Sequence, residues 1–308
     1  MKIALVIPCY NEEAVLNETV RRLLPVAQTL REKHHEMTVY CVDDGSRDAT
    51  WQVIETLAAE HPFLHGLKLA RNAGHQKAVW AGLEYVADKC DAAISIDADL
   101  QDDVTAVVAM VDACESGAEV VYGVRRQRTT DTFFKRTTAL AFYRMMQAMG
   151  VDMVYNHADY RLMTRRVIEA LMQYPERNIF LRGMVPLIGF KTAEVYYDRA
   201  ERFAGESKYP LGKMLNFAVD GITSFSVKPL RLITSLGLLM VILSLFAACY
   251  ALVSYFLGWT IAGWTSLLLS VWFIGGVQLL CVGVLGEYIG KIYTEVKRRP
   301  RYFIEKAI

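Results

Sequence analysis

The chain lacks the spacing patterns that indicate disulfide frameworks and structural metal sites. Its six cysteines lie at positions 9, 41, 90, 114, 249 and 281, and no two of them form a C-x-x-C pair. Its six histidines form no H-E-x-x-H cluster. Irregularly placed cysteines of this kind are typical of a reducing compartment. The sequence therefore offers neither a disulfide framework nor a zinc site.

Two common nucleotide-binding fingerprints are also missing. The chain contains no G-x-G-x-x-G and no G-x-x-x-x-G-K-[ST] segment, which counts against dinucleotide dehydrogenases and P-loop enzymes. A net charge of +1 argues against a dedicated nucleic-acid-binding protein, which is usually basic. Only five apolar residues separate Lys2 from Pro8, too few for a secretory signal. We therefore expect the polar part of the chain to stay in the cytoplasm.

Charge is absent from one long stretch near the C-terminus. No Asp, Glu, Lys or Arg occurs between Leu232 and Gly286. Residues 232–257 and 264–286 are each long enough to cross a bilayer as a helix, although two buried helices of a soluble protein are the alternative. Basic residues lie on both outer flanks, at positions 228, 231, 291, 297, 298, 299 and 301. The positive-inside rule then predicts a plasma (inner) membrane protein with both termini in the cytoplasm.

The segments next to these two spans carry weaker signals. Residues 209–231 are mildly amphipathic, and they either lie along the lipid headgroups or pack on the soluble domain. Residues 291–308 form a basic tail. The second span and its end contain small residues that allow close helix approach, at Gly275, Gly276, Gly283, Gly286 and Gly290. These glycines favour a homo-oligomer.

The remaining part of the chain alternates between two kinds of apolar pattern. Short apolar runs predict strands at residues 3–7, 37–42, 64–69, 92–96 and 120–124. Helical patterns lie between them, at residues 12–33, 48–60, 74–88 and 103–115, the first of them bent or broken at Pro25. Such alternation predicts an α/β fold with a mainly parallel sheet and helices on both faces.

Polar side chains follow the predicted strand at residues 92–96. Asp97 and Asp99 are two residues apart, so both point to one face if the chain stays extended, and Gln101 follows them. Paired carboxylates suit Mg²⁺ or Mn²⁺, and such an ion usually also holds substrate phosphates. An ordinary polar loop after a strand is the alternative interpretation of this D-x-D segment.

Two earlier strand ends support the interpretation as a site. Tyr10, Asn11 and Glu12 follow the first strand, and Asp43 and Asp44 follow the second. Asn11 and Asp44 also fit ordinary turn or cap positions. Because the carboxyl ends of parallel strands meet at one edge, the three clusters are expected to line one cleft.

These segments together resemble a known motif set. Residues 7–12, 43–48, 70–72 and 97–101 are similar to the motifs of family 2 glycosyltransferases with the GT-A fold. Residues 160–163, 202–209 and 286–290 further resemble polyprenyl-phosphate glycosyltransferases of the bactoprenol glucosyltransferase type, with dolichol-phosphate mannose synthase as a more distant relative. The Q-x-x-R-W signature of processive synthases is absent, which argues against repeated chain elongation.

The resemblance implies a reaction and a division into domains. Residues 1–208 would form a cytoplasmic GT-A domain, which transfers one sugar with inversion from a nucleotide-sugar to polyprenyl (undecaprenyl) phosphate, using Mg²⁺ or Mn²⁺. UDP-glucose is the first expected donor. A UDP-N-acetylhexosamine, a modified UDP-arabinose and GDP-mannose are the alternatives. A non-catalytic, membrane-anchored adaptor that binds a nucleotide-sugar is the alternative of another class.

The resemblance also assigns roles to individual residues. The metal would be held by Asp97, Asp99 and Gln101. The nucleotide-sugar would be bound by Pro8, Tyr10, Glu12, Val42, Asp44, Asp97, Ala98 and Arg125. The catalytic group would comprise Asp97, Asp159 and Arg202.

Cations and one further carboxylate are assigned to the acceptor side. The acceptor phosphate would be positioned by Lys135, Arg136, Arg202 and Lys208, since guanidinium groups make bidentate contacts with phosphate. Taken alone, each of these cations fits an ordinary solvated surface position better than a place in the site. Asp159 is either a base or sugar-positioning group or a structural partner of Arg161 or Arg182. His75 receives no assignment.

Overall fold

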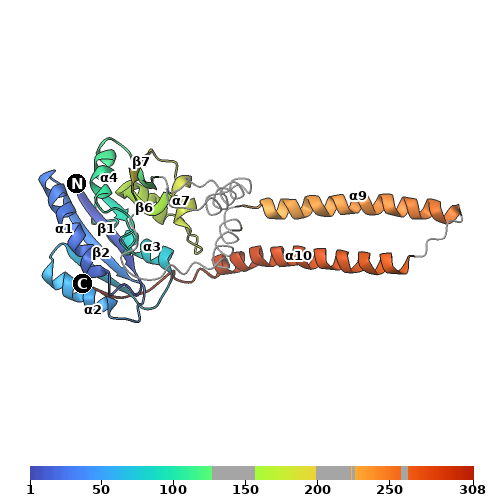
Figure 1. Cartoon of the computed structure of the whole chain (residues 1–308), viewed down its shortest axis with the longest axis horizontal. Helices are drawn as coiled ribbons and strands as arrows, with labels where there is room; N and C mark the ends of the chain where they lie inside the picture. The colour runs from blue at the N-terminus through green and yellow to red at the C-terminus, as the bar shows by residue number, and fades with distance from the viewer. Residues whose placement is uncertain (127–156, 199–222, 224–225, 258–262) are drawn as a thin grey trace. The chain divides into compact units, whose positions relative to one another are not determined.

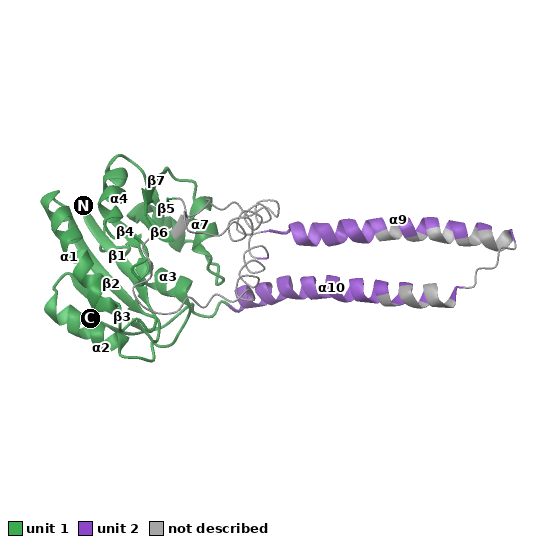
Figure 2. Ribbon diagram, in the orientation of Figure 1, with its two compact units in different colours: residues 1–143, 152–210, 298–308 green, residues 144–151, 211–297 purple. Residues whose placement is uncertain are grey.

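The structure, a computed structural model, describes residues 1–126, 157–198, 223, 226–257 and 263–308 (Figure 1). The chain divides into two compact units (Figure 2). Unit 1 comprises residues 1–143, 152–210 and 298–308, and unit 2 comprises residues 144–151 and 211–297. The C-terminal residues therefore return to unit 1 after the long helices of unit 2.

Unit 1 is built on one sheet of eight strands. The strands are β1 (Lys2–Cys9), β2 (Glu36–Asp43), β3 (Leu64–Leu69), β4 (Ala92–Ser95), β5 (Val120–Arg125), β6 (His157–Thr164), β7 (Thr192–Tyr197) and β8 (Ile304–Ala307). Their order across the sheet is β7-β5-β6-β4-β1-β2-β3-β8. Parallel pairing joins β4, β1, β2 and β3, as the alternating pattern predicts.

Antiparallel strands make the sheet mixed. Strand β6 runs antiparallel to both β4 and β5, and β8 runs antiparallel to β3. The α/β class expected from the sequence is confirmed. Strand β8 lies within the stretch for which the sequence indicated a basic tail, and its short, exposed Ile304–Ala307 run carries no strand pattern of its own.

Helices cover both faces of this sheet. One face carries α1 (Leu16–Glu32), α2 (Thr50–Glu60) and α4 (Ala106–Glu115), and the other carries α3 (His75–Val86) and α6 (Arg165–Met172). A further short helix, α7 (Leu181–Leu187), follows α6. Helix α1 continues through Pro25, so the helix is not broken there, which was one of the two outcomes that the sequence predicted.

The alternation of side chains along β1 explains why both faces are covered. Leu5 and Ile7 belong to a buried apolar cluster with side chains of α1, α2 and α4. Val6 points to the opposite face, where α3 packs closely on the sheet. A Cβ atom added to Gly82 would lie 2.3 Å from Cγ1 of Val6, so this approach requires glycine. The residues that follow the strand ends thus rest on a rigid core that is packed on both faces of the sheet.

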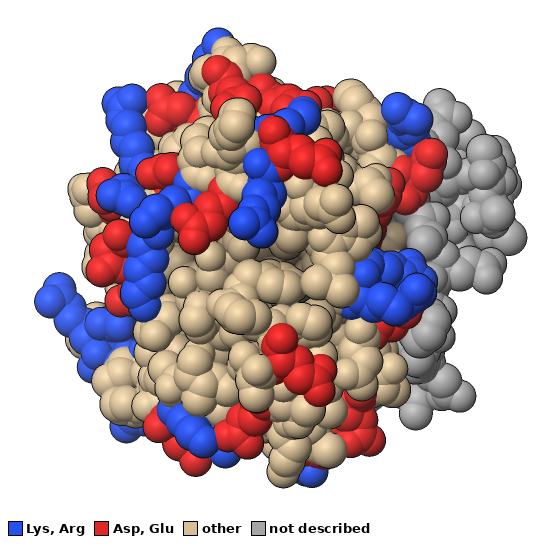
Figure 3. Space-filling view, turned by 90° about the vertical axis from the view of Figure 1, so that its left-hand side faces the viewer, with Lys and Arg blue, Asp and Glu red and all other residues tan. Residues whose placement is uncertain are grey.

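The surface of unit 1 mixes charges of both signs. On the face shown in Figure 3, Lys and Arg side chains lie among Asp and Glu side chains. Surface pairs of opposite charge include Lys33 with Asp112, at 2.6 Å, and Lys306 with Glu55, also at 2.6 Å. This interspersed pattern accords with the near-zero net charge of the chain.

Unit 2 contains two long helices, α9 (Lys228–Phe256) and α10 (Trp264–Lys297), which contact each other. Among the described residues, the stretch Phe273–Lys297 is long and apolar enough to cross a membrane. Most of the large apolar side chains that are exposed among the described residues lie on these two helices, with Phe246 71% and Leu279 75% exposed. Residues 209–222 of the predicted juxtamembrane segment lie outside the described residues. Self-association through the glycines of α10 stays a prediction.

Candidate active site

The loops that follow β1 and β2 are tied together through Asn11. Its backbone N–H donates to Ser46 Oγ at 3.0 Å, and its Oδ1 accepts a hydrogen bond from the Arg47 N–H at 2.9 Å. Asn11 has a φ of 56°, in the left-handed region that asparagine tolerates better than most residues. Asn11 therefore acts as a turn residue that fixes two strand-end loops against each other.

Asp44 fixes a third loop. Its Oδ1 and Oδ2 accept hydrogen bonds from the N–H groups of Ala73 and Gly74, at 2.6 and 2.9 Å. Burial raises the pKa of Asp44, while the two N–H groups act in the opposite direction. The neighbouring Gly45 has a φ of 66°, and a Cβ atom there would lie 2.5 Å from the Asn72 nitrogen. The D-D-G segment thus anchors the loop that leads into α3.

Asp43 was not assigned a role by the sequence. The side chain is completely buried, and its Oδ1 accepts a hydrogen bond from the Ser46 N–H at 3.0 Å. Its Oδ2 is buried without a hydrogen-bond partner among the described residues. An unpaired buried acceptor is costly, so this oxygen is a candidate for contact with a ligand that carries an N–H or O–H group.

The D-x-D segment forms a tight turn after β4. Asp97 and Asp99 are partly exposed, whereas Leu100 between Asp99 and Gln101 is buried and has a φ of 56°. Asp99 Oδ1 accepts a hydrogen bond from the Gln101 N–H at 3.2 Å. A left-handed backbone at a residue with a bulky side chain is strained, and such strain is concentrated at functional sites.

Asp97 belongs to a cluster of charges that extends beyond the turn. Burial raises its pKa to about 6, and His75 partly opposes this increase. His75 Nε2 lies 3.6 Å from Asp97 Oδ1 and 3.7 Å from Asp159 Oδ2. His75, at the start of α3, therefore lies between the two carboxylates. The sequence predicted both carboxylates for the site but gave no role to the histidine.

Asp159 on β6 is surrounded by donors. Its Oδ1 accepts hydrogen bonds from Arg161 Nη2 at 2.6 Å and Arg182 Nε at 3.1 Å. Its Oδ2 accepts from Arg182 Nη2 at 3.1 Å and from Gln76 Nε2 at 3.3 Å. Burial alone would raise the pKa of Asp159, but His75, Arg182 and Arg161 together hold it well below the usual range. Asp159 therefore has the ion pairs that were the structural alternative for this residue.

Arg125 is also held by a carboxylate. Its Nη2 donates to Asp102 Oδ1 at 3.0 Å, and the Tyr197 hydroxyl donates to the same oxygen at 2.6 Å. Asp102 is buried, so these donors compensate its charge. The guanidinium predicted to bind the nucleotide-sugar thus takes part in a buried pair that joins β5, β7 and the D-x-D loop.

The other predicted residues differ in how accessible they are. Tyr10 is 41% exposed, while Pro8, Val42 and Ala98 are buried. The Val42 side chain packs on α3, close to Gly82, which leaves its backbone as the part available to a ligand. The Glu12 N–H donates to Thr50 Oγ1 at 2.8 Å. Lys135, Arg136, Arg202 and Lys208 lie outside the described residues.

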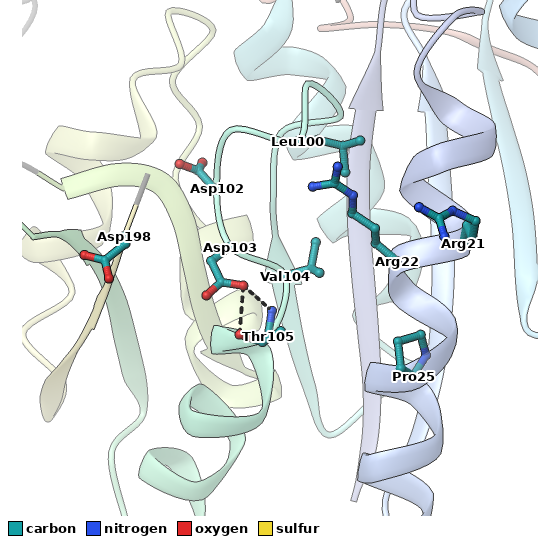
Figure 4. A pocket seen from close by; sticks show the side chains of 9 residues that line it. All are labelled: Arg21, Arg22, Pro25, Leu100, Asp102, Asp103, Val104, Thr105 and Asp198. Atoms are coloured by element: carbon teal, nitrogen blue, oxygen red, sulfur yellow. Dashed lines mark hydrogen bonds between the residues drawn. The ribbon is translucent and has the colours of Figure 1, made fainter. Parts of the chain in front are cut away.

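A cavity of about 430 Å³ lies beside the D-x-D turn (Figure 4). It is lined by Arg21, Arg22, Pro25, Leu100, Asp102, Asp103, Val104, Thr105 and Asp198. None of these lining residues was predicted for the site. Asp103 Oδ1 accepts hydrogen bonds from the backbone N–H and the hydroxyl of Thr105, at 2.9 and 2.8 Å, which stabilises the segment before α4.

Among the residues that the structure describes, no group of three or more His, Cys, Asp and Glu side chains is arranged to hold a metal ion. The D-x-D turn offers two carboxylates and the side-chain oxygen of Gln101 instead. Such a partial set suits an ion that takes its remaining oxygens from a substrate diphosphate and water.

Comparison with known proteins identifies the family. Residues 4–172 match the family described as Glycosyl transferase family 2. The chain belongs to glycosyl transferase family 2. Residues 228–292 of this glycosyltransferase also match the family described as GtrB C-terminal hairpin, which covers α9 and most of α10. The resemblance found in the sequence and the expected GT-A fold class are both confirmed.

Relatives of this glycosyltransferase match it over nearly its whole length. An uncharacterized glycosyltransferase, YkoT of Bacillus subtilis (strain 168), is 53% identical over 98% of this chain and 91% of its own length. A bactoprenol glucosyl transferase of Shigella phage SfII is 41% identical over 100% of this chain and 98% of its own. Among solved structures, glucosyl-3-phosphoglycerate synthase from Mycobacterium tuberculosis has a TM-score of 0.47 at 18% identity, covering 72% of this chain and 76% of its own.

Proposed function

We propose that this glycosyltransferase transfers a single glucose from UDP-glucose to the phosphate of a membrane polyprenyl phosphate, with inversion at the sugar carbon. The product is a sugar joined to the lipid through a phosphodiester. The observation that carries the proposal is the full-length similarity to a protein named bactoprenol glucosyl transferase, 41% identical over 100% of this chain. The charged cluster at the carboxyl edge of the sheet supports it.

The strand-end loops are suited to the nucleotide half of the donor. Asp43 Oδ2 is a buried acceptor without a partner among the described residues, and a uracil ring offers an N–H to such an atom. The exposed ring of Tyr10 is available for stacking on a base. Asp44 and Asn11 contribute indirectly, because their hydrogen bonds hold the surrounding loops in place.

The D-x-D turn fits a divalent cation together with a diphosphate. We assign Asp97, Asp99 and Gln101 as its protein ligands, and a bound Mg²⁺ or Mn²⁺ would supply Lewis-acid stabilisation of the leaving diphosphate. The raised pKa of Asp97, about 6, still leaves this carboxylate mainly ionised near neutral pH. Asp97 can thus ligate an ion near neutral pH.

Asp159 is better suited to positioning than to proton transfer. A carboxylate whose pKa lies well below the usual range is a poor base, and its oxygens are occupied by Arg161, Arg182 and Gln76. A phosphate acceptor is already anionic near neutral pH, so the proposed reaction needs little help from a base. We therefore assign Asp159 to the alignment of the sugar and its neighbouring cations, with Arg202, Lys208, Lys135 and Arg136 proposed for the acceptor phosphate.

Anchoring through α9 and α10 would bring the enzyme to the proposed lipid substrate. Their exposed apolar side chains and the uncharged stretch from Leu232 to Gly286 support a hairpin in the bilayer. Basic residues on both flanks support a catalytic unit and both termini on the cytoplasmic side of the plasma membrane. The nucleotide-sugar would then be drawn from the cytoplasm.

The direct test is sugar transfer into lipid. The purified full chain, in vesicles that contain undecaprenyl phosphate, is incubated with one radiolabelled nucleotide-sugar at a time, with Mg²⁺, Mn²⁺ or a chelator. We expect label in the lipid fraction with UDP-glucose and either metal, and none with the chelator. Transfer from another nucleotide-sugar would change the assigned donor and leave the proposed reaction class as it is. Nucleotide-sugar binding without transfer from any donor would favour the adaptor and overturn the proposal.

A further inference from the structure

Gln76 links three elements around Asp159. It lies in the first turn of α3, and its Nε2 donates to Asp159 Oδ2 on β6 at 3.3 Å. Its Oε1 accepts a hydrogen bond from the N–H of Leu181, the first residue of α7, at 3.0 Å. One side chain therefore joins α3, β6 and the start of α7.

The two partners determine which way the amide points. The ionised carboxylate of Asp159 can only accept a hydrogen bond, and the backbone N–H of Leu181 can only donate one. The amide must therefore turn its nitrogen to Asp159 and its oxygen to Leu181. A glutamate at this position keeps an acceptor for Leu181 but has no donor for Asp159, and an apolar side chain has neither.

The link to Leu181 also fixes the neighbouring Arg182. Nε and Nη2 of Arg182 lie 3.1 Å from Oδ1 and Oδ2 of Asp159, the parallel arrangement that makes guanidinium–carboxylate pairs specific. The pair forms only if the start of α7 and Asp159 hold their relative positions. Arg161 joins the same two groups, because its Nη1 donates to the Leu181 carbonyl at 3.1 Å and its Nη2 to Asp159 Oδ1 at 2.6 Å. Gln76 adds the contact that ties both of them to α3, next to the D-x-D turn.

The same cluster reaches the D-x-D turn. His75, next to Gln76, lies 3.7 Å from Asp159 and 3.6 Å from Asp97. A displacement of Asp159 or of Arg182 therefore changes the charge that faces Asp97. Small displacements next to reacting groups reduce turnover strongly, because the reaction needs aligned atoms.

We propose that Gln76 is a positioning residue for sugar transfer, which aligns Asp159 and Arg182 with Asp97. This inference rests on the proposed function, since it assigns Gln76 to the transfer step of that reaction. The nucleotide contacts proposed at the ends of β1 and β2 do not involve Gln76. Its loss should therefore reduce kcat and leave the KM for the nucleotide-sugar nearly unchanged.

The experiment compares Gln76→Glu and Gln76→Met with the wild-type chain. Gln76→Glu keeps the acceptor for Leu181, removes the donor to Asp159 and adds a charge that competes with Asp159 for Arg182. Gln76→Met removes both hydrogen bonds at a similar side-chain length. We expect both variants to lower kcat about tenfold or more, with KM changed by less than about twofold. Gln52→Glu, the same chemical change on the exposed face of α2, should behave like the wild type.

The outcomes separate positioning from simple support of the fold. A Gln76→Glu variant with wild-type kcat, beside an impaired Gln76→Met, would show that only the bond to Leu181 matters and would overturn the proposal. Wild-type kcat in both variants, or loss of folding in both as measured by thermal unfolding, would also overturn it. Failure of the proposed function would be seen separately, because the wild-type chain itself would then transfer no sugar.

Discussion

Asp99 is the residue at which the metal assignment is most directly tested. It lies in the strained turn before Leu100, and its side chain is partly exposed. We expect Asp99→Ala to lower metal-dependent sugar transfer by about 100-fold or more, because a ligand of the ion that stabilises the leaving group is lost. The measurement is transfer of radiolabelled sugar as a function of Mn²⁺ concentration.

A matched substitution separates this effect from general damage. Asp88→Ala removes an exposed carboxylate at the end of α3 and should leave both transfer and thermal unfolding unchanged. Asp99→Ala should unfold nearly like the wild type, since its side chain is partly exposed and its hydrogen bond to the Gln101 N–H stays within the turn. Full turnover by the Asp99 variant would contradict the assignment of this carboxylate to the metal.

The ion pair between Asp159 and Arg161 is expected to contribute to the free energy of unfolding. Asp159→Asn leaves the fully buried guanidinium of Arg161 without its charged partner, so we expect a loss of about 3–5 kcal/mol of unfolding free energy at pH 7. The folded-state pKa of Asp159 is lowered, so its stabilisation is complete above the unfolded pKa of about 4 and is lost as the pH falls below that value. The difference between wild type and variant should therefore shrink as the pH falls below about 4. Denaturant unfolding at several pH values measures it, and a constant difference would contradict the assignment.

At the scale of elements, the C-terminal segment is held on unit 1 by Arg301. Its guanidinium lies 4.3 Å from the centre of the Trp80 ring on α3. It also donates to the backbone carbonyls of Tyr174 and Glu176, at 2.6 to 3.0 Å. Strand β8 then follows and pairs with β3. Arg301 thus joins the start of the returning chain to α3 and to the segment after α6.

We expect Arg301→Ala to destabilise unit 1 by about 2 kcal/mol, because a cation–π contact and several charged hydrogen bonds are lost together. Thermal unfolding of the full chain in detergent measures the change. Arg299→Ala is the matched control, since Arg299 is exposed, and it should unfold like the wild type. An Arg301 variant as stable as this control would show that the segment is held by β8 alone.

The elements that the sequence predicted are those with local signals. Periodic apolar runs located β1 to β5 and α1 to α4, because burial on one or both sides leaves a repeating pattern. The strand-end clusters also follow from local chemistry, since parallel strands bring their carboxyl ends together. Asp97 and Asp99 could therefore be named before their positions were known, whereas Asp159, inside β6, was assigned only through the resemblance to a known family.

The elements and residues that were missed depend on distant partners. Strand β8 has four exposed residues and forms only because the edge of β3 is open to it. Gln76 gains its importance from Leu181 and Asp159, which are distant in sequence, so spacing gives no sign of it. Asp43 was named in a strand-end cluster, but its unpaired buried oxygen could be found only in the structure. Pro25 was expected to bend or break α1, and it does not break the helix, because packing of Leu23 and Val26 in the core keeps it continuous.

At the scale of the whole molecule, the chain passes from the glycosyltransferase unit into the α9–α10 hairpin and back. Unit 1 contains both the first residues and residues 298–308, which follow α10 directly. A hairpin of two spans returns the chain to the side from which it entered. If the hairpin crosses the bilayer, both ends of unit 1 must therefore lie on one side of it.

Cysteine labelling of intact cells tests this topology. The native cysteines give a low background, because four are buried in unit 1 and Cys249 and Cys281 lie in the proposed spans. A membrane-impermeant maleimide should label Thr260→Cys, between the two helices, without permeabilisation. Arg299→Cys, on the exposed stretch after α10, should be labelled only once the membrane is opened. Equal labelling of both positions in intact cells would mean that α9 and α10 do not form a spanning hairpin, and the lipid substrate would then have to reach the site by another route.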